Sequence, residues 1–130
     1  KGGNSEFRCT IRTGELYLNS AEAAAQSDNL PEARKRLLQL MEKRYTAEAY
    51  AQKKTYVEGL SKVELVKEIV NERARELAFE GHRWFDLRRT TRPRIEKTLN
   101  KQQYVLEQDD SRYTLQIPKE AIAANPNLSH

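Results

Sequence analysis

The sequence predicts a mostly α-helical protein made of tetratricopeptide-like helix hairpins, with a small β-hairpin near its carboxyl end. Two observations carry this prediction. Apolar residues recur every three or four positions along much of the chain, and after Pro93 the pattern changes to alternation. The 130 residues are a usual size for one domain. No apolar run approaches the roughly 18 residues that a membrane-spanning helix requires.

A helix hairpin is expected over about residues 14–44. Its first half, GELYLNSAEAAAQ, is rich in small residues, which allow a second helix to approach closely. The second half opens with Pro31, which is tolerated in a first helical turn, and carries Leu37, Leu40 and Met41 at helical spacing. The length and the DNLPEA junction resemble one tetratricopeptide-like unit of about 34 residues.

Two further helices are expected over about residues 62–89. Ser61 as N-cap and Glu64 three positions later form a capping box, which is a strong signal for the start of a helix. Gly81 either permits a close helix contact or marks a break before a second, short helix. Before this start, we expect the preceding helix to continue through Ala51 and then to loosen.

A β-hairpin is expected over about residues 103–117. The segments QYVLE and RYTLQIP alternate or run apolar, and the QDDS between them has the residues typical of a turn. Pro118 ends the second of the two expected strands.

Charge and cysteine content argue against several function classes. The 23 basic and 19 acidic residues interleave to a net charge of +4, which favours ion-paired helix faces over a phosphate-binding stripe. We therefore expect no nucleic-acid partner. The single cysteine, Cys9, supports neither a disulfide framework nor a Cys-x-x-Cys metal site. Because no phosphate-cradling glycine loop or His-Glu-x-x-His motif occurs, no cofactor and no metal are expected.

A row of four acids lies along one face of the predicted helix, at Glu68, Glu72, Glu76 and Glu80. Carboxylate-bridged metal sites in helix bundles place a histidine three residues after a ligating glutamate. His82 follows Glu80 by only two residues, so the spacing does not fit. We interpret the row as a solvated face whose acids pair with arginines three residues away in the sequence.

The stretch FEGHRWFDLRR, residues 79–89, is unusually dense in charged and aromatic side chains. His82 stands four residues before Asp86 and could act as an oriented general base, but no nucleophile is evident for it to activate. We therefore predict no catalytic residues and no enzymatic activity. Trp84 aligns with Leu77 on the apolar face, which favours core packing over stacking on a ligand.

An ion-pair network is expected at the edge of this core. Asp86 should be ionised and held by one or more of Arg83, Arg88 and Arg89. Arginine suits this role because its planar fork can bind a carboxylate through two parallel hydrogen bonds and can also donate to backbone carbonyls.

Three motifs carry a family resemblance: RTGELYLNSAEAAA at 12–25, ERARELAFEGHRWFDLRR at 72–89 and YTLQIPKEAIAANPNL at 113–128. In this order they resemble the carboxyl-terminal part of the SusD/RagB family of bacterial outer-membrane nutrient-binding lipoproteins. Thr90 and Thr91 depart from the pattern, because an aromatic residue and a glycine commonly follow the arginines. The positions that match the family's structural signature are Glu80, Gly81, Arg83, Trp84, Asp86 and Arg88.

The resemblance implies that residues 1–130 are the carboxyl-terminal region of a longer, mostly helical, SusD-like protein. It implies a lipoprotein exposed at the surface of the outer membrane and held there only by an upstream lipid anchor. Such a protein captures an oligosaccharide or other nutrient for a SusC-like TonB-dependent transporter and is not an enzyme. Because family members bind ligand largely through upstream segments, no ligand-binding position carries over, and this segment is expected to be mainly structural scaffold.

A second hypothesis is an unrelated tetratricopeptide-like adaptor that binds protein partners through the hairpin at 14–44. The chain opens without an initiator methionine, so we expect it to be a piece of a longer protein. The upstream sequence distinguishes the hypotheses, because a SusD/RagB protein requires a signal peptide followed by a lipidated cysteine.

Overall fold

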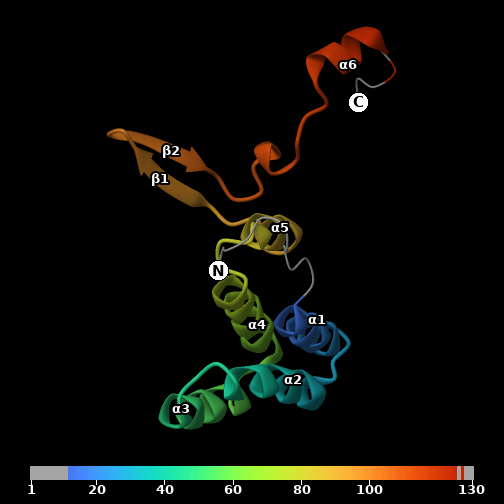
Figure 1. Ribbon diagram of the computed structural model, residues 1–130. Coiled ribbons are helices and arrows are strands. Elements are labelled where there is room, and N and C mark those ends of the chain that lie inside the picture. The colour runs from blue at the N-terminus through green and yellow to red at the C-terminus, as the bar shows by residue number, and fades with distance from the viewer. Residues whose placement is uncertain (1–11, 126, 128–130) are drawn as a thin grey trace, which may run out of the picture. The chain divides into compact units, whose positions relative to one another are not determined.

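A computed structural model describes residues 12–125 and 127, so Cys9 lies outside the described part (Figure 1). The chain divides into two compact units, Lys1–Arg83 and Trp84–His130. The described residues form a mostly α-helical fold with a two-stranded antiparallel hairpin towards the carboxyl end, as predicted. The elements are α1 (Thr13–Gln26), α2 (Leu30–Glu42), α3 (Ala47–Glu58), α4 (Lys62–Glu76), α5 (His82–Arg89), β1 (Ile95–Leu99), β2 (Gln102–Leu106), the 3-10 helix η1 (Ser111–Tyr113) and α6 (Lys119–Ala124).

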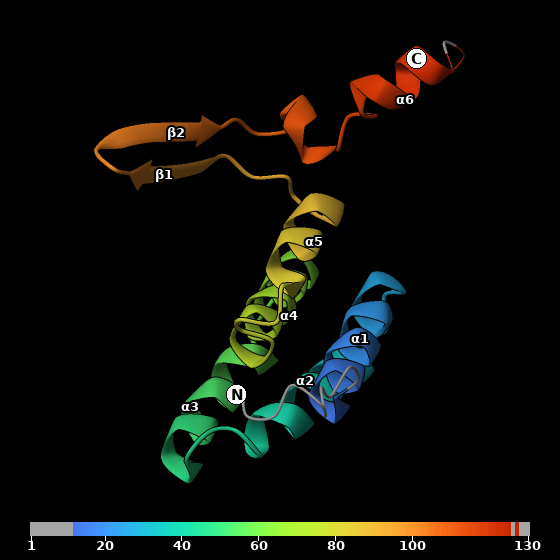
Figure 2. The same cartoon turned by 45° about the horizontal axis from the view of Figure 1, so that its top comes forward.

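The predicted helix hairpin is formed by α1 and α2, which pack side by side in the first unit (Figures 1 and 2). The small residues Ala21 and Ala25 of α1 are fully buried, so the helices approach closely where the sequence is poorest in large side chains. α4 packs against α1 and closes the core. The fully buried leucines Leu18, Leu37 and Leu65 come from α1, α2 and α4 respectively.

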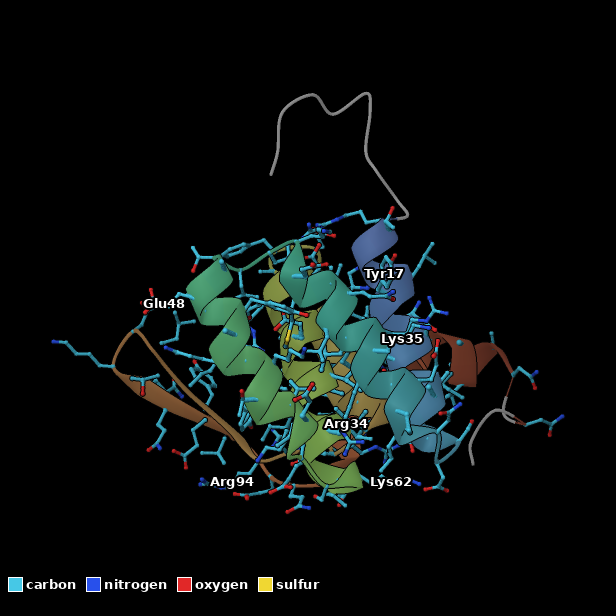
Figure 3. The ribbon with its side chains drawn as sticks, turned by 90° about the horizontal axis from the view of Figure 1, so that it is seen from below. Tyr17, Arg34, Lys35, Glu48, Lys62 and Arg94 are labelled. Carbon is cyan, nitrogen blue, oxygen red and sulfur yellow. The ribbon has the colours of Figure 1, made fainter. Side chains whose placement is uncertain are left out.

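The prediction for the residues after this hairpin was wrong. α2 ends at Glu42, and a separate helix, α3, begins at Ala47. Thr46 is its N-cap and accepts a hydrogen bond from the Ala49 amide at 3.4 Å, a capping signal that the sequence interpretation missed. From α2, Arg34 reaches the end of α3 (Figure 3), where its guanidinium donates to the carbonyls of Val57 at 3.3 Å and Leu60 at 2.7 Å.

α4 begins at the predicted capping box. The Ser61 hydroxyl accepts from the Glu64 amide at 3.5 Å, and the Glu64 carboxylate accepts from the Ser61 amide at 2.9 Å. The helix ends at Glu76, and α5 starts after a turn in which Phe79 and Gly81 have φ angles of 67° and 82°. Gly81 therefore marks a break between two helices, which was one of the two roles left open.

The β-hairpin of the second unit differs from the one predicted over 103–117. The expected first strand is part of β2, and its partner is the upstream strand β1, with Ile95 opposite Leu106. Asn100 and Lys101 form the two-residue turn with φ angles of 50° and 64°. Positive φ at both central residues is what a tight hairpin turn needs, and asparagine tolerates it better than most residues.

The QDDS segment does not connect two strands. Asp110 instead caps η1, and its carboxylate accepts from the Arg112 amide at 2.9 Å. Thr114 is a bend, and residues 114–118 belong to no sheet. The expected second strand is therefore not formed, and α6 begins at Lys119.

Candidate functional site

Three acids of α4 form the main charged cluster of the first unit, which we call the acid row: Glu68, Glu72 and Glu76. Their side chains are only 8%, 3% and 6% exposed. The prediction of a solvated face was therefore wrong for these three positions. The predicted pairing of an acid with an arginine three residues away is confirmed for Glu72, which Arg75 binds. The other basic partners come from outside α4, and spacing along one helix does not reveal them.

Glu76 receives two arginines. The Arg44 guanidinium binds it through two hydrogen bonds, from Nε to Oε2 at 2.9 Å and from Nη2 to Oε1 at 3.0 Å. Arg12, just before α1, contacts both Glu76 and Glu80. The hydrogen bonds from Arg44 lower the pKa of Glu76 despite the opposing effect of burial, and Arg12 adds to the lowering. Glu76 is therefore held as a carboxylate that joins three segments of the unit.

Gly14 makes room for this contact. A Cβ atom at Gly14 would lie 2.5 Å from Glu76 Oε1 and 3.0 Å from its Cδ. Glycine therefore allows the first turn of α1 to approach the carboxylate that Arg12 and Arg44 bind. The requirement is one of space, since Gly14 lies in the first turn of α1 and is not among the residues with a positive φ angle.

Glu72 and Glu68 share one arginine. Arg75 donates to Glu72 at 2.8 Å through Nε and to Glu68 at 2.7 Å through Nη2. The Tyr45 hydroxyl donates to Glu72 Oε2 at 3.0 Å, and Lys53 lies 3.2 Å from Glu68. Burial and the neighbouring Glu72 raise the pKa of Tyr45, so its hydroxyl keeps its proton and remains a donor.

The acid row fits a structural role better than a chemical one. Each of its carboxylates is already bound by at least one cation, and a general acid near neutral pH needs a raised pKa, whereas that of Glu76 is lowered. Within residues 12–125 and 127, no three potential metal ligands come together. Through ion pairs, the arrangement links α4 to Arg12 at the N-cap of α1, to Arg44 just before α3 and to Lys53 within α3.

Three residues of the sequence signature lie in the first unit. Glu80 contacts Arg12, and Gly81 supplies the positive φ of the turn before α5, where no other atom lies within 4 Å of its missing Cβ. Arg83 donates to the backbone carbonyl of Val70 at 3.4 Å. The ring nitrogen Nδ1 of His82 lies 3.9 Å from a carboxylate oxygen of Glu15.

The other three signature residues lie in the second unit. Asp86 is 2% exposed, and of the three arginines predicted to hold it, Arg89 does so, with Nη2 and Nε at 2.7 Å and 3.1 Å from Oδ1. The backbone carbonyl of Arg88 accepts from Arg92 at 3.1 Å. The six signature positions are thus divided equally between the two units.

The prediction that Trp84 is a buried core residue was wrong. Its side chain is 39% exposed, and its indole stacks on the ring of Tyr113 with the centroids 5.2 Å apart and the planes 8° from parallel. Tyr113 is the buried member of the pair, at 1% exposed, and its hydroxyl donates to the carbonyl of Pro93. The helical period of α4 does not carry into α5, because the turn at Phe79 and Gly81 resets it.

The sequence interpretation also missed the partners of the acid row. Arg12, Arg44 and Tyr45 are distant from α4 in sequence, and nothing in their local pattern distinguishes them from surface residues.

Comparison with known proteins agrees with the resemblance noted in the sequence. A model of the SusD family matches residues 1–130. The chain belongs to the SusD family. No curated protein matches the chain. The described residues contain no helix that is long and apolar enough to cross a lipid bilayer.

Proposed function

We propose that this SusD-family chain is the carboxyl-terminal, mainly structural region of a protein that binds a glycan or other nutrient at the bacterial cell surface. That protein would sit on the outer membrane through an upstream lipid anchor and pass its ligand to a SusC-like TonB-dependent transporter. The observation that carries the proposal is the family match over the whole chain, since proteins of this family are binding proteins and not enzymes.

The contacts of the first unit support the scaffold role. The acids that would be the natural polar groups of a ligand site, Glu68, Glu72 and Glu76, are bound by basic side chains of the same unit. Breaking these pairs to bind a sugar would leave buried charges without partners, which is costly. We therefore expect the ligand site to lie on other segments of the parent protein.

Calorimetry with a panel of oligosaccharides tests the proposal, with this chain and the full-length parent protein titrated side by side. We expect binding by the parent and little or none by the chain. Copurification of the parent with an outer-membrane transporter tests the partner. Tight binding by the chain alone would place the ligand site here instead. A parent that binds no glycan or other nutrient and copurifies with no transporter would favour the tetratricopeptide-like adaptor.

A further inference from the structure

One face of the β-hairpin in the second unit is exposed along the half nearest its turn. Lys97 stands opposite Tyr104, and Leu99 stands opposite Gln102. Directly opposite residues of an antiparallel pair point to the same face, and so do alternate residues of one strand. The four side chains therefore form one surface, which we call the hairpin face. Its apolar members are Leu99 and Tyr104, which are 62% and 51% exposed.

Two observations agree with this assignment. The Tyr104 hydroxyl donates to the side-chain oxygen of Gln102 at 2.9 Å, so these two side chains lie on the same face. In Figures 1 and 2 the two strands run out from the rest of their own unit, with the turn at the free end. The hairpin face is therefore open to a partner.

The outer half of the hairpin is also basic. From Lys97 onwards the hairpin reads KTLNKQQYVL, which contains two lysines and no acid. Lys97 lies on the hairpin face and Lys101 lies in the turn. Both are exposed, and neither forms an ion pair in the described part of the chain. The acids on either side of this stretch, Glu96 and Glu107, both pair with Arg94.

The combination of lysine, leucine and tyrosine on one face favours one kind of partner. A hydrated polyanion would pair with the lysines but would leave Leu99 in water. A protein partner is disfavoured, because lysine is depleted from the buried centre of protein interfaces. A bilayer surface suits all three residue types. Lipid phosphates attract lysine, tyrosine rings are enriched at the level of the headgroups, and leucine gains by leaving water.

We propose that the outer half of the hairpin docks on an anionic lipid surface, with Lys97 and Lys101 against the lipid phosphates and with Leu99 and Tyr104 in the headgroup layer. Two lysines and two apolar side chains give only weak, reversible binding by themselves. The contact becomes effective when an anchor already holds the protein at the membrane, because the local concentration of lipid is then high. The inference therefore rests on one element of the proposed function, the attachment of the parent protein to the outer membrane, and not on nutrient binding.

Cosedimentation of this chain with lipid vesicles at low ionic strength tests the contact. Vesicles of phosphatidylcholine with phosphatidylglycerol should bind more of the chain than vesicles of phosphatidylcholine alone, and added salt should release it. The double variant Lys97→Gln, Lys101→Gln should bind the anionic vesicles about 30-fold more weakly, which corresponds to about 1 kcal/mol for each lysine.

A matched control separates the hairpin from the net charge of +4, which by itself attracts anionic vesicles. Lys35→Gln combined with Lys54→Gln removes the same charge from exposed positions of α2 and α3. This variant should bind nearly as tightly as the unsubstituted chain. Equal losses in the two double variants would overturn the proposal, because net charge alone would then account for the binding.

Tryptophan emission distinguishes a lipid surface from a soluble polyanion. In Leu99→Trp, anionic vesicles should shift the emission to shorter wavelength, whereas Thr98→Trp, on the opposite face of β1, should show a smaller shift. Dextran sulfate should not shift the emission of Leu99→Trp. Equal shifts at the two positions, or a shift with dextran sulfate as large as with vesicles, would contradict docking of this face on lipid. A parent protein that fractionates away from the outer membrane would instead contradict the proposed attachment, whatever the vesicles show.

Discussion

Gly14 and Glu76 occupy adjoining space so closely that a Cβ atom on Gly14 would lie 2.5 Å from Glu76 Oε1. Because Arg12 and Arg44 both bind this carboxylate, moving it aside would disturb two ion pairs at once. A side chain at this glycine is therefore expected to destabilise the first unit.

Gly14→Ala should destabilise the protein, although alanine is the better helix former by about 1 kcal/mol. Overpacking of a filled site typically costs about 1–3 kcal/mol, which exceeds that gain. Gly59→Ala is the matched control, because a Cβ there would meet its nearest atom at 3.7 Å and the φ angle is −86°. Urea unfolding should show a lower midpoint for the first variant and little change for the second. Equal midpoints would contradict the close approach of α1 to Glu76.

Lowering the pH should reduce the free energy of unfolding, partly because Glu76 becomes protonated. The folded state lowers the pKa of Glu76 below its ordinary value of 4.5, mainly through the hydrogen bonds from Arg44. The carboxylate therefore contributes stability above pH 4.5 and loses this contribution as the pH falls towards the folded-state pKa. The unfolding free energy of Glu76→Gln should accordingly fall less steeply below that pH. A slope for Glu76→Gln as steep as that of the unsubstituted protein would contradict this contribution.

Tyr45→Phe removes the hydroxyl that donates to Glu72 at 3.0 Å. A hydrogen bond to a charged group is worth about 1.5–3 kcal/mol, and Arg75 still binds Glu72 in the variant. We expect a loss near the lower end of that range, measured by chemical denaturation. Tyr56→Phe serves as the control, because Tyr56 is 50% exposed. A loss in the control as large as in Tyr45→Phe would argue against a specific role for the Tyr45 hydroxyl.

Trp84 is the single tryptophan, so its fluorescence reports directly on the stack with Tyr113. Tyr113→Ala should shift the emission to longer wavelength, since the face of the indole that packs on the tyrosine ring becomes hydrated. Tyr104→Ala, at an exposed position of β2, should leave the emission unchanged. If the two variants give the same spectrum, Trp84 does not pack on Tyr113 in solution.

The start of α4 was predictable from the sequence, whereas the N-cap of α3 at Thr46 was missed. Ser61 and Glu64 define the first turn of α4 through contacts between residues three apart, so the sequence contains all the information required. The hairpin was harder, because Asn100 and Lys101 lack the glycine that usually marks such a turn. QDDS presented a stronger turn signal, and its Asp110 caps a 3-10 helix instead of connecting strands.

The acid row could not be predicted from α4 alone. Four-residue spacing places acids on one helix face, but whether that face is exposed to solvent or buried depends on the residues that pack against it. Here the residues that contact the acids are Arg44 and Tyr45, about thirty residues upstream, together with Arg12. For the same reason the stack of Trp84 on Tyr113 was missed, since it joins residues on either side of the β-hairpin.

The two arginines on Glu76 also imply an order of folding. Arg44 lies 32 residues before Glu76 and Arg12 lies 64 residues before it. Closing the longer loop costs about 0.6 kcal/mol more in chain entropy, since each doubling of loop length adds that amount. We therefore expect Arg44 to reach Glu76 first and the start of α1 to dock afterwards. Although α1 leaves the ribosome before α4, its first turn would be among the last parts of the unit to become ordered.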